Sequence, residues 1–189
     1  ELSKKIGLYL ESIGYAVRLQ TVSKYAATVG LEEMLPGHNE ACADAFKDCQ
    51  TIGFVGATGI AVRTIAPLLV SKIVDPAVVS VDERGTYVIP LVSGHIGGAN
   101  ELSRCLAAYI GGTACVTTAT DVNGLFAVDE WAARNHMTIC SMKAAKDFAA
   151  ALVDKQKVGL YVDDSFAVAG ALPLNVERGT AFSTGMAIT

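Results

Sequence analysis

TIGFVGATGIAVRTIAPLLVSK, residues 51–72, passes from an apolar run through a glycine-rich turn into a segment with helical spacing. Residues 51–55 have the β-branched and aromatic content of a strand, and GATG at 56–59 supplies the turn. The apolar residues that follow recur at the period of a helix. A strand that leads directly into a helix is the building unit of α/β folds, so this stretch predicts that class.

The segments on either side continue the same pattern. Residues 2–13 predict a helix, 15–22 a strand and 39–49 a second helix, with a loop between the last two. Further along, PAVVSV and TYVIPLV are β-branched runs separated by DERG, which predicts a β-hairpin. We expect an α/β fold, an open, mostly parallel sheet flanked by helices with a β-hairpin element, followed by a smaller α/β unit.

The character of the sequence changes near residue 136. Before this point the loops hold glycine and polar clusters, whereas residues 137–164 predict a strand, a helix and a strand with ordinary loops. We expect an N-terminal α/β domain with glycine-rich loops over 1–136 and a middle α/β region over 137–189. The last apolar segment begins without a helix to complete it, so we expect the second region to be incomplete.

Composition excludes several classes of function. The net charge is −4, and no basic stripe is present, so nucleic-acid binding is not expected. No apolar run reaches the roughly 18 residues that would span a bilayer. The five cysteines form no CxxC pair, as is typical of reduced thiols in a cytoplasmic protein. We expect a soluble cytoplasmic protein with a small-molecule ligand.

Three loops are candidates for that ligand, because α/β sheets bind ligands beyond the carboxyl ends of their strands. They are 56–59, 93–100 and 118–124. If the three preceding strands are parallel neighbours, the loops converge on one edge. The first offers backbone N–H groups at a helix N-terminus, with Arg63 one turn along, although tight packing of the helix on the strand explains it equally well.

SGHIGGAN, residues 93–100, is the most unusual of the three. Its glycines permit close approach of the backbone to a ligand, and His95 can exchange a proton near neutral pH. Glu101 follows in the first turn of a predicted helix, where the helix dipole favours an acid regardless of function. A structural role for His95 remains an alternative, and so does a turn-and-cap role for the loop at 118–124.

The candidate residues divide into two groups. Those with catalytic chemistry are His95, Glu101 and Asp121. Those placed to contact a substrate are Gly56, Thr58, Gly59, Arg63, Ser93, Gly94, Gly97, Gly98, Asn100, Thr120 and Asn123. The three histidines are too far apart in sequence to suggest a metal site, and we expect none. No GxSxG motif marks a nucleophilic serine.

The loops together resemble one known family, CbiG of anaerobic cobalamin biosynthesis. The resemblance lies in GATGIAVRTIAPLL (56–69), DPAVVSVDERGTYVIPLVSGHIGGANELS (75–103) and TTATDVNG (117–124), in the family's order and spacing. It is strong over about residues 50–130, which correspond to the family's N-terminal region. Residues from about 137 resemble the family's middle region, and we expect the family's C-terminal domain to be absent from this sequence.

The resemblance implies a cobalt-precorrin-5A hydrolase, in which water opens the ring A δ-lactone and a two-carbon unit leaves as acetaldehyde. His95, or Glu101 oriented by His95, would activate the water, and N–H groups of the 93–98 or GATG loops would stabilise the oxyanion. Arg63 would hold a carboxylate, with Arg84 and Arg104 nearby, and Asp121 would assist acetaldehyde loss. Cobalt arrives with the substrate, so no cofactor is expected. Contact with other cobalamin-pathway enzymes is possible for such a protein, and so is a homodimer. Two other functions stay open: a non-catalytic module that binds a tetrapyrrole, and an α/β enzyme that binds a phosphorylated ligand.

Overall fold

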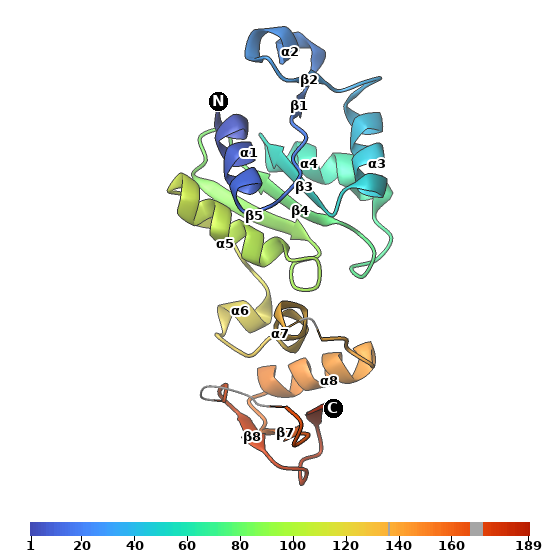
Figure 1. Ribbon diagram of the computed structural model, residues 1–189, viewed down its shortest axis with the longest axis vertical. Helices are drawn as coiled ribbons and strands as arrows, with labels where there is room; N and C mark the ends of the chain where they lie inside the picture. The colour runs from blue at the N-terminus through green and yellow to red at the C-terminus, as the bar shows by residue number, and fades with distance from the viewer. Residues whose placement is uncertain (136, 167–171) are drawn as a thin grey trace. The chain divides into compact units, whose positions relative to one another are not determined.

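The computed structural model describes residues 1–135, 137–166 and 172–189, which form two compact units (Figure 1). Unit 1 is Glu1–Val116 and unit 2 is Thr117–Thr189. The division therefore lies between Val116 and Thr117, before the change of character near residue 136. Phe126 and Trp131 explain the difference, because both pack in the same apolar cluster as Phe148 of unit 2.

Unit 1 is built on a four-stranded sheet in the order β3-β4-β5-β6. The strands are β3 (Thr51–Val55), β4 (Ala77–Val81), β5 (Tyr87–Val92) and β6 (Thr113–Ala114). β3 is parallel to β4 and β5 is parallel to β6, whereas β4 and β5 are antiparallel. The expected hairpin is present as the antiparallel pair of β4 and β5. This pair lies at the centre of the sheet, between the parallel pairings of β3 with β4 and of β5 with β6.

Helices cover both faces of this sheet. Alternate residues of a strand point to opposite faces, and in β4 Val79 and Val81 belong to one apolar cluster while Val78 belongs to another. The first cluster joins the sheet to α1 (Leu2–Ser12) and α5 (Ala99–Ile110). The second joins it to α3 (His38–Asp48), α4 (Thr58–Ile65) and the short 3-10 helix η1 (Ala66–Leu68). This arrangement confirms the α/β class.

The segment between α1 and α3 differs from expectation. The strand predicted over 15–22 is limited to β1 (Gln20–Thr21), because its only partner within the described residues is the two-residue strand β2 (Glu32–Glu33). The predicted loop before α3 contains β2 and the helix α2 (Ser23–Val29). Strand length here is set by the available hydrogen-bonding partner, which the local sequence does not reveal.

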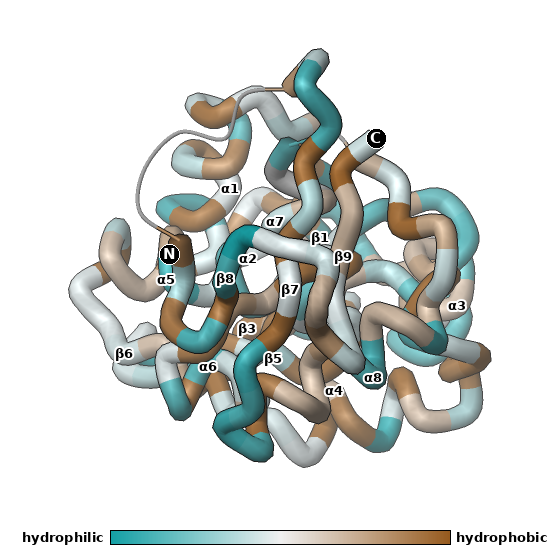
Figure 2. The backbone as a smooth tube through the Cα atoms, turned by 90° about the horizontal axis from the view of Figure 1, so that it is seen from below, coloured by the Kyte–Doolittle hydropathy of each residue, from teal (hydrophilic) through white to brown (hydrophobic). Residues whose placement is uncertain are grey.

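Unit 2 contains a parallel sheet in the order β8-β7-β9, from Val176–Arg178, Val158–Val162 and Gly185–Ile188. Its helices are α6 (Ala119–Val122), α7 (Val128–Arg134) and α8 (Met142–Val153). Phe148 and Leu152 on α8 are buried against β7. The edge strand β8 is largely hydrophilic in Figure 2 because Glu177 and Arg178 follow Val176. No strand forms at 137–140, where one was expected.

Candidate functional site

The glycine-rich loop at 93–98 forms a tight turn that leads from β5 into α5. The backbone N–H of Gly98 donates to the carbonyl of His95 at 3.0 Å, and that of Asn100 donates to the carbonyl of Gly94 at 2.9 Å. Ser93 has a φ of 56°, in the left-handed region that a residue with a side chain rarely adopts. A strained residue held by surrounding structure is a frequent property of functional sites.

Two glycines of this loop are required by its own packing. A Cβ atom at Gly94 would lie 2.7 Å from Oδ1 of Asn100. A Cβ atom at Gly97 would lie 2.5 Å from Cβ and 2.7 Å from the carbonyl oxygen of Ser93. Asn100 is 1% exposed, so its side chain is fixed beneath the loop. The glycines were predicted to let a ligand approach the backbone closely. In the structure, the atoms that approach Gly94 and Gly97 closely are those of Asn100 and Ser93.

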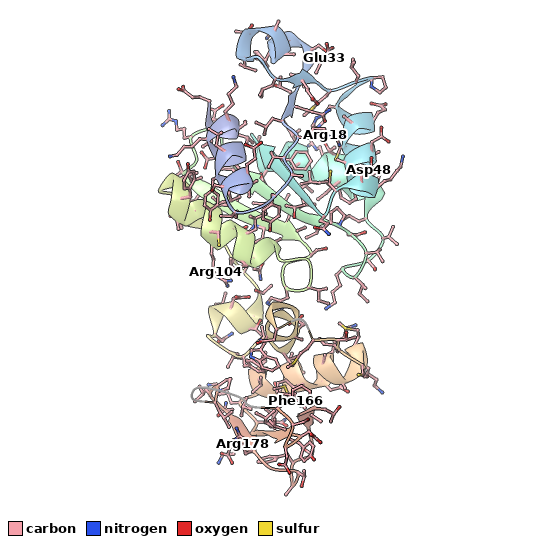
Figure 3. All side chains as sticks on the ribbon, in the orientation of Figure 1. Arg18, Glu33, Asp48, Arg104, Phe166 and Arg178 are labelled. Atoms are coloured by element: carbon pink, nitrogen blue, oxygen red, sulfur yellow. The ribbon has the colours of Figure 1, made fainter. Side chains whose placement is uncertain are left out.

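The titratable groups of this region are accessible to solvent. His95 is half-buried on the loop, and Glu101 lies in the first turn of α5. The carboxylate of Glu101 lies 3.4 Å from the guanidinium of Arg104, which Figure 3 labels on α5. Because these two side chains are 46% and 38% exposed, their ion pair is weak. An imidazole and a carboxylate in this setting can both exchange protons with a bound water.

Asp75 is part of this region and was missed in the sequence. Its carbonyl accepts a hydrogen bond from Oγ of Ser93 at 2.9 Å. Its carboxylate accepts the backbone N–H of Val70 at 3.0 and 3.2 Å. Asp75 therefore joins the segment that precedes β4 to the glycine-rich loop. The Asp-Pro pair at 75–76 is typical of such a turn, and was the available signal.

The GATG turn and the loop that holds His95 lie at opposite ends of the strands of the sheet. The prediction that these two loops converge is therefore wrong. GATG follows the carboxyl end of β3, beside the end of β4, where Gly56 N–H donates to the Val81 carbonyl at 2.8 Å. β5 runs antiparallel to β4, so the 93–98 loop lies where β4 begins. GATG therefore cannot supply oxyanion donors to chemistry at His95.

The residues around GATG join α4 to the sheet. Thr58 Oγ1 lies 3.1 Å from the hydroxyl of Ser80, which is fully buried on β4. A Cβ atom at Gly59 would meet nothing within 4 Å, so close packing does not explain that glycine. Arg63 is exposed in the last turn of α4. From there the chain passes through η1 to the start of β4. Arg84 lies in the hairpin turn, at the edge away from His95.

The third loop belongs to unit 2 and forms the turn at the start of α6. The hydroxyl of Thr118 donates to the carboxylate of Asp121, and the amide of Asn123 donates to the Ala119 carbonyl at 2.8 Å. Thr120 is buried at the start of α6. These contacts match the turn part of the turn-and-cap alternative, whereas the N-cap residue Thr118 makes no side-chain cap hydrogen bond to α6. Unit 1, which holds His95, does not contain this loop, and a catalytic role for Asp121 stays a prediction.

Two further properties of the described residues bear on function. Among residues 1–135, 137–166 and 172–189, no group of three or more His, Cys, Asp or Glu side chains is placed to hold a metal ion. His38 is structural: its Nε2 lies 2.9 Å from Oγ1 of Thr64, a hydroxyl that itself donates to the carbonyl of Ile60. His136 lies outside the described residues. Within the same ranges, no helix is both long and apolar enough to span a membrane.

Comparison with known proteins matches much of unit 1 to a known family. Residues 40–121 match the family described as cobalamin synthesis G N-terminal. The chain is 46% identical over 128 residues to a cobalt-precorrin-5A hydrolase of Salmonella typhimurium, a match covering 67% of this chain and 36% of the relative. It is 36% identical over 115 residues to a cobalt-precorrin-5A hydrolase of Priestia megaterium, covering 61% and 31%. The chain thus spans about a third of the length of these relatives.

A solved structure supports the fold. The crystal structure described as a cobalamin biosynthesis protein G homolog from Sulfolobus solfataricus matches with a TM-score of 0.55 at 23% identity. The match covers 98% of this chain and 54% of that one. At this identity the likeness concerns the arrangement of helices and strands.

Proposed function

The chain belongs to the CbiG family through residues 40–121, and on that premise we propose that it acts in cobalt-precorrin-5A hydrolysis. In this proposal the 93–98 loop and the first turn of α5 form the part of the active site that unit 1 contributes. The substrate is a cobalt-containing tetrapyrrole whose lactone is opened by water. Cobalt is part of the substrate, so the chain need not hold a metal of its own.

The observation that carries the proposal is the construction of the loop around His95. A left-handed Ser93, two sterically required glycines and a buried Asn100 hold one half-buried imidazole at the sheet edge. A residue with a side chain in the left-handed region is uncommon, and such an outlier next to His95 points to a functional role for the loop. Such rigidity suits a group that must meet a water and a carbonyl carbon in one fixed geometry.

His95 is the proposed general base for lactone opening. The imidazole accepts a proton from water as the oxygen attacks the lactone carbonyl, and it gives this proton to the leaving alkoxide oxygen as the acyl C–O bond breaks. The N–H groups of Gly98, Ala99 and Asn100 already donate within the loop, to His95, Ser93 and Gly94, so the oxyanion must meet other donors. Loss of the proton from the freed hydroxyl makes a carbonyl as the C–C bond to the ring breaks, which releases acetaldehyde and leaves the electron pair on the macrocycle.

Replacement of His95 tests this role. We expect His95→Ala to lower acetaldehyde release from cobalt-precorrin-5A by about 10²–10⁴-fold, the range for loss of a general base, with the corrinoid still bound. The measurement is coupled detection of acetaldehyde, with the full-length Salmonella relative as the positive control. His38→Gln is the matched control, because His38 contacts Thr64 on the other face of the sheet.

The outcomes separate the alternatives. Near-normal release by His95→Ala removes His95 from the mechanism and directs attention to Glu101. Binding of the corrinoid by the unaltered chain without any acetaldehyde indicates a tetrapyrrole-binding module. Competition by phosphate compounds without corrinoid binding indicates an enzyme of another class.

A further inference from the structure

The segment Leu69–Val74, called the apolar loop below, exposes an unusual amount of apolar surface. Val70 is 82% exposed, Ile73 60% and Val74 68%, and Leu69 is 42% exposed beside them. Single apolar side chains are common on protein surfaces, but here four exposed ones lie within six residues of one loop. Exposed apolar surface gathered in this way marks places that meet an apolar partner.

The apolar loop is held in a defined conformation. The carboxylate of Asp75 accepts the N–H of Val70, and the carbonyl of Ser71 accepts the N–H groups of Val74 at 3.2 Å and Asp75 at 2.9 Å. Ordering a segment costs conformational entropy, and here it is not offset by burial of the loop's own side chains. The hydrogen bonds therefore fix these side chains in a position where they face solvent.

The apolar loop lies at the same end of the strands as His95. It leads into the start of β4, and the 93–98 loop follows the end of β5, the strand paired with that start through Val78 and Val92 (Figure 1). The Ser93 hydroxyl donates to the Asp75 carbonyl and links the two segments directly. A ligand at His95 therefore has this apolar surface beside it.

A cation lies within the apolar loop. Lys72 is exposed and forms no hydrogen bond or ion pair with any residue in the part of the chain that the structure describes. The apolar loop thus presents apolar side chains together with one ammonium group. A tetrapyrrole has the complementary chemistry, since its ring faces are apolar and its rim carries carboxylates.

We propose that the apolar loop is a substrate subsite, in which Val70, Ile73 and Val74 contact a face of the macrocycle and Lys72 pairs with a carboxylate on its rim. This inference rests on the proposed function, and it assigns to substrate binding a segment outside the glycine-rich loops. The occupant follows from charge complementarity and from the link to the 93–98 loop through Asp75.

Binding of a stable analogue tests the subsite. The probe is a cobalt corrin with free rim carboxylates, compared with the methyl esters of the same corrin, and the dissociation constants are measured by equilibrium dialysis. We expect the double variant Val70→Ser/Val74→Ser to weaken binding of both forms about tenfold or more, because the apolar area that the macrocycle would bury is lost. We expect Lys72→Gln to weaken binding of the carboxylate form about fivefold, the usual size of an exposed ion pair, and to leave binding of the ester unchanged.

Matched controls come from α1 in the same unit. Leu8→Ser removes an apolar side chain that is 67% exposed, and Lys4→Gln removes an exposed ammonium. Both controls should bind the corrin as the unaltered chain does. All replaced side chains are exposed, so circular dichroism and the unfolding midpoint should be unchanged for every variant.

Each outcome has a separate meaning. Failure of the unaltered chain to bind either corrin contradicts the proposed function itself. Normal corrin binding by the apolar-loop variants overturns the subsite alone. If Val70→Ser/Val74→Ser instead converts a dimer to a monomer in sedimentation and leaves corrin binding intact, the patch is an interface between copies and the subsite is wrong.

Discussion

Gly97 is the position in the 93–98 loop with the least room for a side chain. Its nearest obstacle is the backbone and Cβ of Ser93, neither of which can rotate away. We expect Gly97→Ala to destabilise unit 1 by about 1–3 kcal/mol, the usual cost of overpacking, and to displace His95. Urea unfolding followed by circular dichroism measures the loss of stability, and acetaldehyde release reports the displacement.

Gly59→Ala is the matched control for stability. A Cβ atom at Gly59 meets nothing within 4 Å, and the residue lies within α4. Alanine is the better helix former by up to about 1 kcal/mol, so this variant should be as stable as the unaltered chain or more stable. Equal losses from Gly97→Ala and Gly59→Ala would show that the steric argument is incorrect.

Single residues also show what the sequence could and could not predict about the site. The pattern of residues 93–101 correctly identified a glycine-dependent loop followed by a helix with Glu101 in its first turn. It could not indicate that Ser93 and Asn100 occupy the space where the glycine side chains would lie, because local sequence does not report which atoms approach one another. The contribution of Asp75 was missed for the same reason, since its contact with Ser93 links positions 18 residues apart.

At the scale of elements, the β4–β5 hairpin depends on Asp82. The backbone N–H of Tyr87, together with that of Arg84, donates to the Asp82 carboxylate and lowers the pKa of this group. The charged form is therefore favoured in the folded state. Its contribution to stability is complete above the unfolded pKa of about 4 and is lost as the pH falls toward the folded pKa.

We expect Asp82→Asn to lower the urea midpoint at pH 7 and to lower it less as the pH falls below about 4. At acidic pH the unaltered chain itself carries a protonated Asp82, so the two midpoints should converge. Glu83→Gln is the control, because Glu83 is exposed in the same turn and its side chain takes no part in the hydrogen bonds to Asp82. A difference between Asp82→Asn and the unaltered chain that stays constant with pH would contradict the argument.

The hairpin also explains the main error in the predicted site. DERG between two β-branched runs correctly predicted an antiparallel pair, confirmed by β4 and β5. That pairing reverses the chain, so the end of β5 must lie at the opposite edge from the end of β3. The assumption that the strands before GATG and SGHIGGAN are parallel neighbours was inconsistent with the hairpin. The sequence predicted which segments are strands and helices here. The relative directions of the strands could be predicted only by considering all strand pairings of the sheet together.

At the scale of the molecule, the division into units follows the apolar clusters rather than local character. The sequence before residue 136 resembles unit 1 in its polar loops, yet Phe126 and Trp131 pack with the core of unit 2. Such long-range packing has no local signature. The class of each unit was predictable, since strand and helix patterns are local, whereas the boundary depends on which apolar residues meet.

Phe148→Ala tests the division. Phe148 is 1% exposed in a cluster drawn from unit 2, and its loss should destabilise that unit by about 3–5 kcal/mol. Trp131 is the single tryptophan and packs on Phe126, which in turn packs on Phe148, so its fluorescence reports unit 2 alone. Hydrogen exchange of the β4 amides reports unit 1. We expect the fluorescence midpoint to fall while β4 protection is unchanged, and Val79→Ala to give the reverse. If Phe148→Ala lowers both signals together, the two units unfold as one, and the boundary at Val116 does not separate independent folding units.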